Sequence, residues 1–230
     1  MKSYFITGTD TGVGKTTITA ALAASIKKLG VDVGVMKPVA TGIPQKSGFK
    51  SHDASVLCQA CGVDDAEDLV NPVFMPLPAS PYDVSKILEI KFDREIIFEK
   101  FMKLKTKHEM LLVEGIGGIM TPLSQDYFVA DMIKAMDLET IIVTRSTLGT
   151  LNHTLMTVNT CHDYDITIKG IIVNNYDEKG GTAEKNAPST LYEITKIPIL
   201  GILPFVKDYQ NVEMMISHVQ KNIDLKSLIS

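Results

Sequence analysis

Short apolar runs alternate along the chain with longer segments in which apolar residues recur every three or four positions. The runs are apolar throughout, which predicts strands buried on both faces, and the longer segments predict amphipathic helices. Strands are expected at residues 4–6, 31–36, 110–113, 140–144, 169–173 and 199–203, and helices at residues 16–29, 54–61, 93–107, 128–136, 150–161 and 189–195. This alternation predicts an α/β fold, a doubly wound, largely parallel sheet with helices on both faces.

Two segments without a clear period interrupt the alternation in the first half of the chain. Residues 38–52 are polar and rich in proline and glycine, which predicts a loop long enough to act as a lid or binding loop. Residues 69–82 contain four prolines. They therefore predict an irregular connection with one short strand at most, at 69–70 or 73–74, which cannot be central in a sheet.

The C-terminal third carries two weaker signals. Residues 176–187 are polar and contain two glycines, which predicts a mobile loop. Residues 208–230 predict one or two weaker helices. Because 230 residues suit one sizeable α/β domain, we expect a single domain over residues 1–230, with residues 207–230 as a weaker C-terminal tail; two small domains are the alternative.

Composition narrows the class of protein. Hydrophobic residues make up 45% of the chain, enough to fill the core of one α/β domain. The net charge of −4 argues against a nucleic-acid partner, which selects a basic face. No apolar run has the length of a membrane span or, before Asp10, of a signal peptide, and three cysteines form no even-numbered disulfide framework. We therefore expect a cytoplasmic protein without membrane or nucleic-acid partners.

A glycine-rich segment, Gly8-Thr-Asp-Thr-Gly-Val-Gly-Lys-Thr-Thr17, lies between the first expected strand and the first expected helix. Glycines let backbone N–H groups curl round an anion, and the helix N-terminus adds a partial positive charge. Lys15 would contact the β- and γ-phosphates of a nucleotide, and the Thr16 hydroxyl would bind Mg2+. The first glycine stands one residue earlier than the usual spacing, so the segment predicts a variant P-loop of the NTPase type.

Further polar residues follow the expected strands. Lys37 ends the second strand, Asp53 begins the helix after the 38–52 loop, and Glu114 ends the third strand. Since ligands bind beyond the carboxyl ends of parallel strands, Glu114 and Asp53 are candidate metal ligands. Asn174, after another strand, suits recognition of a base edge. The same residues also fit plain roles, Lys37 as an exposed strand-end lysine, Asp53 as a helix cap and Asn174 as a turn residue.

Taken together, six short motifs resemble those of the dethiobiotin synthetase family, and the resemblance covers about residues 3–205. The motifs are Gly8-Thr-Asp-Thr-Gly-Val-Gly-Lys-Thr16, Lys37-Pro-Val-Ala-Thr-Gly42, His52-Asp-Ala54, Val113-Glu-Gly-Ile-Gly-Gly118, Thr121-Pro-Leu123 and Leu151-Asn-His153. The resemblance implies an ATP-dependent ligase that carboxylates 7,8-diaminononanoate with CO2, activates the carbamate with ATP and Mg2+, and closes a cyclic urea.

The resemblance also implies roles for individual residues. Lys15 and Lys37 are the expected catalytic residues, because Lys37 matches the family's active lysine and would stabilise charge on the carbamate and the transferring phosphoryl group. The expected metal ligands are Thr16, Asp53 and Glu114. The expected nucleotide contacts are Gly12, Val13, Gly14, Lys15, Thr16, Thr17, Asp53, Glu114, Gly115, Ile116, Gly117, Asn174, Asn175, Pro204, Phe205 and Val206. The expected substrate contacts are Thr11, Thr41, Gly118, Thr150, Leu151 and Asn152.

Residues 150–152 begin an expected helix, whose free N–H groups suit the distant carboxylate of the substrate. By resemblance, the partner subunit holds that carboxylate, which implies a homodimer with the substrate site near the subunit interface. The chain departs from the family at Thr41, where serine is usual, and at Asn211, which lies near the position of a usual acid. The preference for ATP over other nucleoside triphosphates is therefore left open.

Two other classes share parts of this pattern. A partitioning or switch ATPase would have the same sheet and P-loop, but such proteins typically carry a second lysine where Asp10 stands here. An amidotransferase-related synthetase would need a nucleophilic Cys–His set to supply ammonia. Cys161 and His162 are adjacent on an expected helix, so their side chains cannot face one site.

Overall fold

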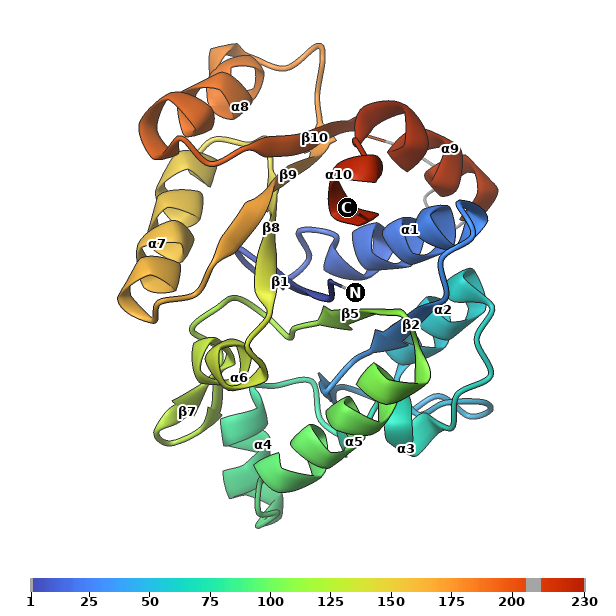
Figure 1. Ribbon diagram of the computed structural model, residues 1–230. Coiled ribbons are helices and arrows are strands. Elements are labelled where there is room, and N and C mark those ends of the chain that lie inside the picture. The colour runs from blue at the N-terminus through green and yellow to red at the C-terminus, as the bar shows by residue number, and fades with distance from the viewer. Residues whose placement is uncertain (1, 206–211, 230) are drawn as a thin grey trace.

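A computed structural model describes residues 2–205 and 212–229. Its centre is a six-stranded sheet in the order β10-β9-β8-β1-β5-β2, in which every pairing is parallel (Figure 1). The strands are β1 (Tyr4–Gly8), β2 (Val33–Met36), β5 (Met110–Glu114), β8 (Glu139–Arg145), β9 (Ile168–Tyr176) and β10 (Ile199–Pro204). The six strands predicted from apolar runs are confirmed, each within two or three residues of its expected ends.

Helices cover both faces of the sheet (Figure 1). In the described residues they are α1 (Lys15–Lys28), α2 (His52–Cys61), α3 (Glu67–Val70), α4 (Pro81–Leu88), α5 (Arg94–Lys107), α6 (Val129–Met136), α7 (Thr150–Asp163), α8 (Thr182–Thr195), α9 (Val212–Asn222) and α10 (Lys226–Ile229). The doubly wound fold expected from the sequence is therefore confirmed.

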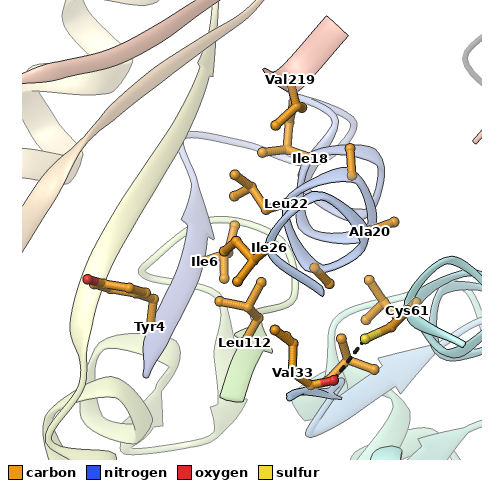
Figure 2. Close-up of a cluster of buried hydrophobic side chains, with 14 of the residues drawn as sticks. Tyr4, Ile6, Ile18, Ala20, Leu22, Ile26, Val33, Cys61, Leu112 and Val219 are labelled. Atoms are coloured by element: carbon orange, nitrogen blue, oxygen red, sulfur yellow. Dashed lines mark hydrogen bonds between the residues drawn. The ribbon is translucent and has the colours of Figure 1, made fainter. Parts of the chain in front are cut away.

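Two buried clusters lie on the two faces, because successive residues of a strand point to opposite sides. On β1, Tyr4 and Ile6 pack with α1, α2 and α9, whereas Phe5 packs with α5, α6 and α7. Figure 2 shows the first cluster, where Ile18 and Leu22 of α1 lie between the sheet and Val219 of α9. Both faces of β1 are thus fully buried, and the loop that follows it is held by a rigid strand.

The connections between the main elements are more ordered than the sequence indicated. The predicted 38–52 loop contains β3 (Val39–Thr41), which pairs in parallel with β4 (Val73–Met75). The alternative strand position, 69–70, is wrong, because those residues belong to α3. A second small sheet joins β6 (Pro122–Ser124) to β7 (Tyr127–Phe128).

Helix α4 and the first half of helix α8 were missed, where proline and glycine are frequent in the sequence, whereas the helix expected at 189–195 is the second half of α8. Helix α4 begins at Pro81, since Ser80 caps it by accepting a hydrogen bond from the backbone N–H of Asp83. Helix α8 begins at Thr182, so the predicted loop over 176–187 is wrong in its second half. Pro188 lies inside α8, and this helix breaker concealed the first two turns in the sequence pattern.

The C-terminal residues pack onto the body of the protein. Helices α9 and α10 confirm the one or two helices expected after residue 208, and α9 packs against α1 (Figure 1). The buried hydroxyl of Tyr4 in β1 donates to the carbonyl of Leu228 in α10, at 3.0 Å. Across residues 2–205 and 212–229, no helix is both long enough and apolar enough to cross a membrane.

Candidate active site

A cavity of about 910 Å3 opens at the carboxyl ends of the strands. It is lined by the glycine-rich loop after β1, the ends of β2, β5, β9 and β10, and the starts of α2 and α4. The predicted residues along it are Thr11, Gly12, Gly14, Lys15, Thr16, Thr17, Lys37, Thr41, Asp53, Glu114, Ile116, Gly117, Asn174, Asn175, Pro204 and Phe205. The structure therefore brings most of the sequence-predicted site into one crevice, as a parallel sheet requires.

The glycine-rich loop has the backbone of an anion-binding loop. Gly12 and Gly14 have φ angles of 72° and 97°, which favour glycine, and Gly14 is the N-cap of α1. No side chain of the described residues caps this helix, so its first N–H groups are available to a ligand. The Lys15 ammonium donates to the carbonyls of Gly117 (2.6 Å) and Asp10 (3.0 Å), which places its charge above the loop.

Beside this loop, one buried lysine joins two acids. The Lys37 ammonium lies 2.6 Å from Glu114 Oε1 and 3.0 Å from Asp53 Oδ2, and it donates to the Gly115 carbonyl at 3.0 Å. The side chains of Lys37 and Glu114 are 4% and 1% exposed, whereas that of Asp53 is 41% exposed. The alternative interpretation of Lys37 as an exposed lysine at a strand end is therefore wrong. Ser51, and not Asp53, caps α2.

Burial and charge shift the pKa values of this cluster in opposite directions. Burial alone would lower the pKa of Lys37, but Glu114 and Asp53 outweigh it and raise that pKa. Burial raises the pKa of Glu114, and Lys37 opposes this only in part. Burial would also raise the pKa of Asp53, yet the nearby Lys37 ammonium holds it below the usual value. Lys37 is thus firmly protonated at neutral pH, and Asp53 is ionised.

The predicted metal ligands fit a magnesium ion. The Thr16 hydroxyl donates to Glu114 Oε1 at 2.7 Å, while the buried Oε2 of Glu114 has no hydrogen-bond partner among the described residues. An unpaired buried oxygen of this kind suits a cation. The described residues contain no cluster of three His, Cys, Asp or Glu side chains that could hold a metal by itself. Two carboxylates and a hydroxyl are nevertheless sufficient for Mg2+, which usually takes further oxygens from substrate phosphates and water.

Some predicted residues lie behind the cavity wall. Val13 is 3% exposed, and Gly115 contributes a carbonyl to Lys37. Gly118 donates its N–H to Thr121. Residues 150–152 begin α7 but do not line the cavity of the single chain, and the buried Thr150 hydroxyl donates to the Arg145 carbonyl at 2.6 Å. Their roles as substrate contacts stay predictions, and Val206 lies outside the described residues.

The structure adds residues that the sequence did not single out. Met215 of α9 lines the cavity, although α9 belongs to the C-terminal part of the chain, where the sequence pattern is weak. Pro78 also lines it. Thr121 and Pro122, which belong to the Thr121-Pro-Leu123 motif of the family resemblance but were given no site role, line it too. Arg145 ends β8 and contacts the glycine-rich loop. It could have been found by counting one residue beyond the expected strand at 140–144.

The parallel sheet, the glycine-rich loop and the acid at the end of β5 define a P-loop NTPase fold. Among solved structures, the cell division protein MinD from Aquifex aeolicus aligns with a TM-score of 0.57, at 16% identity over 95% of this chain and 89% of that one. A ParA family ATPase from Chlorobium tepidum aligns with a TM-score of 0.54, at 20% identity over 96% and 93%. At such identities the likeness concerns the fold alone.

Sequence comparison is more specific. A protein-family profile described as "AAA domain" matches residues 2–213. The ATP-dependent dethiobiotin synthetase of Nitrosopumilus maritimus is 51% identical over the full length of both chains. That of Methanocaldococcus jannaschii is 37% identical over 90% of this chain and 95% of its own. The chain belongs to the dethiobiotin synthetase family, and it is an ATP-dependent ligase that forms carbon–nitrogen bonds.

The charge of Lys15 makes nucleotide affinity depend on pH. Burial, together with the nearby charge of Lys37, lowers the pKa of Lys15 to about 8. In the nucleotide-free protein Lys15 therefore loses its proton above about pH 8, whereas a bound phosphate requires the charged form. We expect ADP affinity to fall up to about tenfold per pH unit above that point, with uptake of a proton on binding. Calorimetry in two buffers of different ionisation enthalpy measures this uptake.

Adenosine is the control for this measurement, because it carries no phosphate and should bind without proton uptake. An ADP affinity that does not change between about pH 7 and pH 9.5 would contradict the assigned charge state of Lys15.

Proposed function

We propose that the chain forms the cyclic urea of dethiobiotin from 7,8-diaminononanoate and CO2, with hydrolysis of ATP to ADP and phosphate. The observation that carries the proposal is the convergence of Lys37, Asp53, Glu114 and Thr16 beside the Lys15 loop. Two buried or half-buried carboxylates and two lysines at one point match the needs of phosphoryl transfer, which are mainly positioning and charge neutralisation.

The reaction has three balanced steps. One amine of the substrate adds to CO2 and loses a proton, which forms a carbon–nitrogen bond and a carbamate. A carbamate oxygen then attacks the γ-phosphorus of ATP, and ADP leaves with the electrons of the broken P–O bond. The second amine attacks the carbonyl carbon of the resulting carbamic–phosphoric anhydride, loses a proton and expels phosphate, which closes the five-membered ring.

Lys15 and Lys37 have separate roles in this scheme. Lys15 would neutralise the β- and γ-phosphates from its position over the loop. All three N–H donors of Lys37 are engaged, by Glu114, Asp53 and the Gly115 carbonyl. To bind the carbamate or the transferring phosphoryl group, Lys37 must break its hydrogen bond to one of these three partners. Asp53 is the partner that it can release at least cost, because Asp53 is partly exposed to water.

Thr16, Asp53 and Glu114 would hold Mg2+ when the nucleotide is bound. The ion would supply positive charge to the phosphate oxygens, which lowers the barrier to phosphoryl transfer. Thr41 and Thr11 line the same cavity and would contact the diamine. Asn175, Pro204 and Phe205 line the cavity and would surround the nucleotide base, whereas the Nδ2 donor of Asn174 is bound to the Val13 carbonyl of the loop.

The same proposal includes a homodimer. Residues 150–152 at the start of α7 would hold the carboxylate of a substrate bound in the partner's cavity. Apolar side chains near this point support an interface, since Leu148 is 86% exposed and Met156 is 61% exposed. A cytoplasmic location, without membrane or nucleic-acid partners, stays a prediction.

A reconstitution with defined reactants tests the reaction. The purified protein is incubated with diaminononanoate, isotopically labelled bicarbonate, Mg2+ and ATP, and the products are identified by mass spectrometry. We expect the label in the urea carbon of dethiobiotin, with ADP and product formed in equal amounts. Omission of the diamine is the control and should abolish ADP release. ADP release without the labelled urea would contradict the proposal.

A further inference from the structure

A side chain at the end of β8 forms a hydrogen bond to the backbone of the glycine-rich loop. The Arg145 guanidinium donates through Nη2 to the carbonyl of Gly12, and the Thr150 hydroxyl fixes the backbone of Arg145 through its carbonyl. Strand β8 pairs directly with β1, from which the loop emerges, and the N–H of Thr9 donates to the Val143 carbonyl. Arg145 therefore acts on the loop from a rigid position in the sheet.

The neighbouring strand supplies a second contact of the same kind. Asn174 in β9 is 6% exposed, and its side-chain nitrogen Nδ2 donates to the carbonyl of Val13 at 2.9 Å. The donor group of Asn174, a residue assigned from the sequence to base recognition, is thus engaged with the loop. Two side chains from adjacent strands consequently bind two consecutive carbonyls, those of Gly12 and Val13.

These two contacts determine where the next N–H groups point. In a planar trans peptide the carbonyl and the following N–H point in opposite directions, and this chain has no cis peptide among the described residues. With the Gly12 and Val13 carbonyls drawn towards Arg145 and Asn174, the N–H groups of Val13 and Gly14 face away from those side chains. An anion-binding loop needs successive backbone N–H groups that point away from the supporting side chains and towards the anion.

The glycines of the loop stand where these side chains approach most closely. A Cβ atom added to Gly12 would lie 2.9 Å from Arg145 Nη2, and one added to Gly14 would lie 2.1 Å from Asn174 Nδ2. At Gly14 the neighbouring side chain is buried, so glycine is required there by Asn174 as well as by its positive φ angle. At Gly12 a side chain would displace the end of Arg145, and the positive φ angle favours glycine.

We propose that Arg145 and Asn174 are positioning residues, which hold the loop in its anion-binding form and direct the N–H groups of Val13 and Gly14 towards the β-phosphate of the nucleotide. Arg145 binds the loop from the side opposite to that on which these N–H groups point. Its Nε atom is buried and has no hydrogen-bond partner within the described part of the chain, so the guanidinium keeps an unused donor there. The inference rests on nucleotide binding and not on the identity of the substrate that accepts the phosphoryl group.

Binding measurements with ADP and AMP, in the presence of EDTA, test this assignment. ADP has a β-phosphate and AMP does not. We expect Arg145→Gln to weaken ADP binding about tenfold or more, since a hydrogen bond to a charged group is lost, and to change AMP binding less than about threefold. Asn174→Ala should show the same selectivity with a smaller loss of ADP affinity.

Arg94→Gln is the matched control, because Arg94 is the other arginine of the chain and forms an exposed ion pair with Glu95. It should leave both affinities unchanged. The melting temperature of each variant without nucleotide shows whether it is folded. If Arg145→Gln is not folded, the ADP and AMP affinities of Asn174→Ala test the assignment. Equal losses for ADP and AMP, or an unchanged ADP affinity, would overturn the assignment. Neither outcome would disprove dethiobiotin formation, which the labelled-bicarbonate experiment tests separately.

Discussion

Replacement of Lys37 by alanine should lower the turnover number at saturating substrates about a hundredfold, while the protein remains folded. Lys37 is buried next to the loop and carries a positive charge that Glu114 and Asp53 stabilise. A fixed cation of this kind, in a site shielded from water, contributes about 3 kcal/mol to the stabilisation of a charged transition state. Steady-state measurement of ADP release coupled to dethiobiotin formation gives the turnover number.

Lys103→Ala is the matched control for this variant, because Lys103 also pairs with a glutamate, Glu99, but on the exposed face of α5. Its turnover should equal that of the unchanged protein. Near-normal turnover of Lys37→Ala would remove Lys37 from the mechanism, whatever its position in the cavity.

The second large effect concerns stability. Glu114→Gln should lower the free energy of unfolding at neutral pH by about 3 kcal/mol, because it leaves the buried Lys37 without its nearest counter-charge. The remaining contacts of Lys37, with Asp53 and the Gly115 carbonyl, keep the loss at the lower end of the range for a broken buried ion pair. Urea denaturation followed by circular dichroism measures the change.

A double variant separates the charge effect from a packing effect. Lys37→Met combined with Glu114→Gln removes both charges, so it should recover more than half of the stability that Glu114→Gln alone loses. Glu99→Gln is the surface control and should cost less than about 1 kcal/mol. Losses that simply add in the double variant would show that Lys37 and Glu114 do not stabilise each other.

The sequence predicted the central sheet well because the inner strands β1, β5 and β8 are buried on both faces and therefore consist mainly of apolar residues. Such runs also locate the strand ends, which is why the sequence alone places Lys37, Glu114 and Asn174 in one crevice. The P-loop could also be predicted from the sequence, since its chemistry depends on glycine and lysine at fixed spacing.

The parts that the sequence did not predict depend on contacts between distant segments. Strand β3 forms only because β4 pairs with it, and neither segment has a pattern that identifies the other. Helix α8 contains Pro188 and follows two glycines, so its local preference opposes the helix that packing stabilises. Likewise, the contact of Arg145 with Gly12 joins residues 133 positions apart, and no local pattern indicates such a pair.

The hydrogen bond between Tyr4 and Leu228 has a consequence for synthesis on the ribosome. It joins the first strand to a residue 224 positions later, and β1 also lies between β5 and β8, which the ribosome produces more than a hundred residues afterwards. A fully buried strand of the sheet is therefore made first, and both of its neighbours are made later. The apolar segment Tyr4–Gly8 gains its first neighbour when β5 has emerged from the ribosome and its second when β8 has emerged, so chaperone protection of Tyr4–Gly8 matters most before that point.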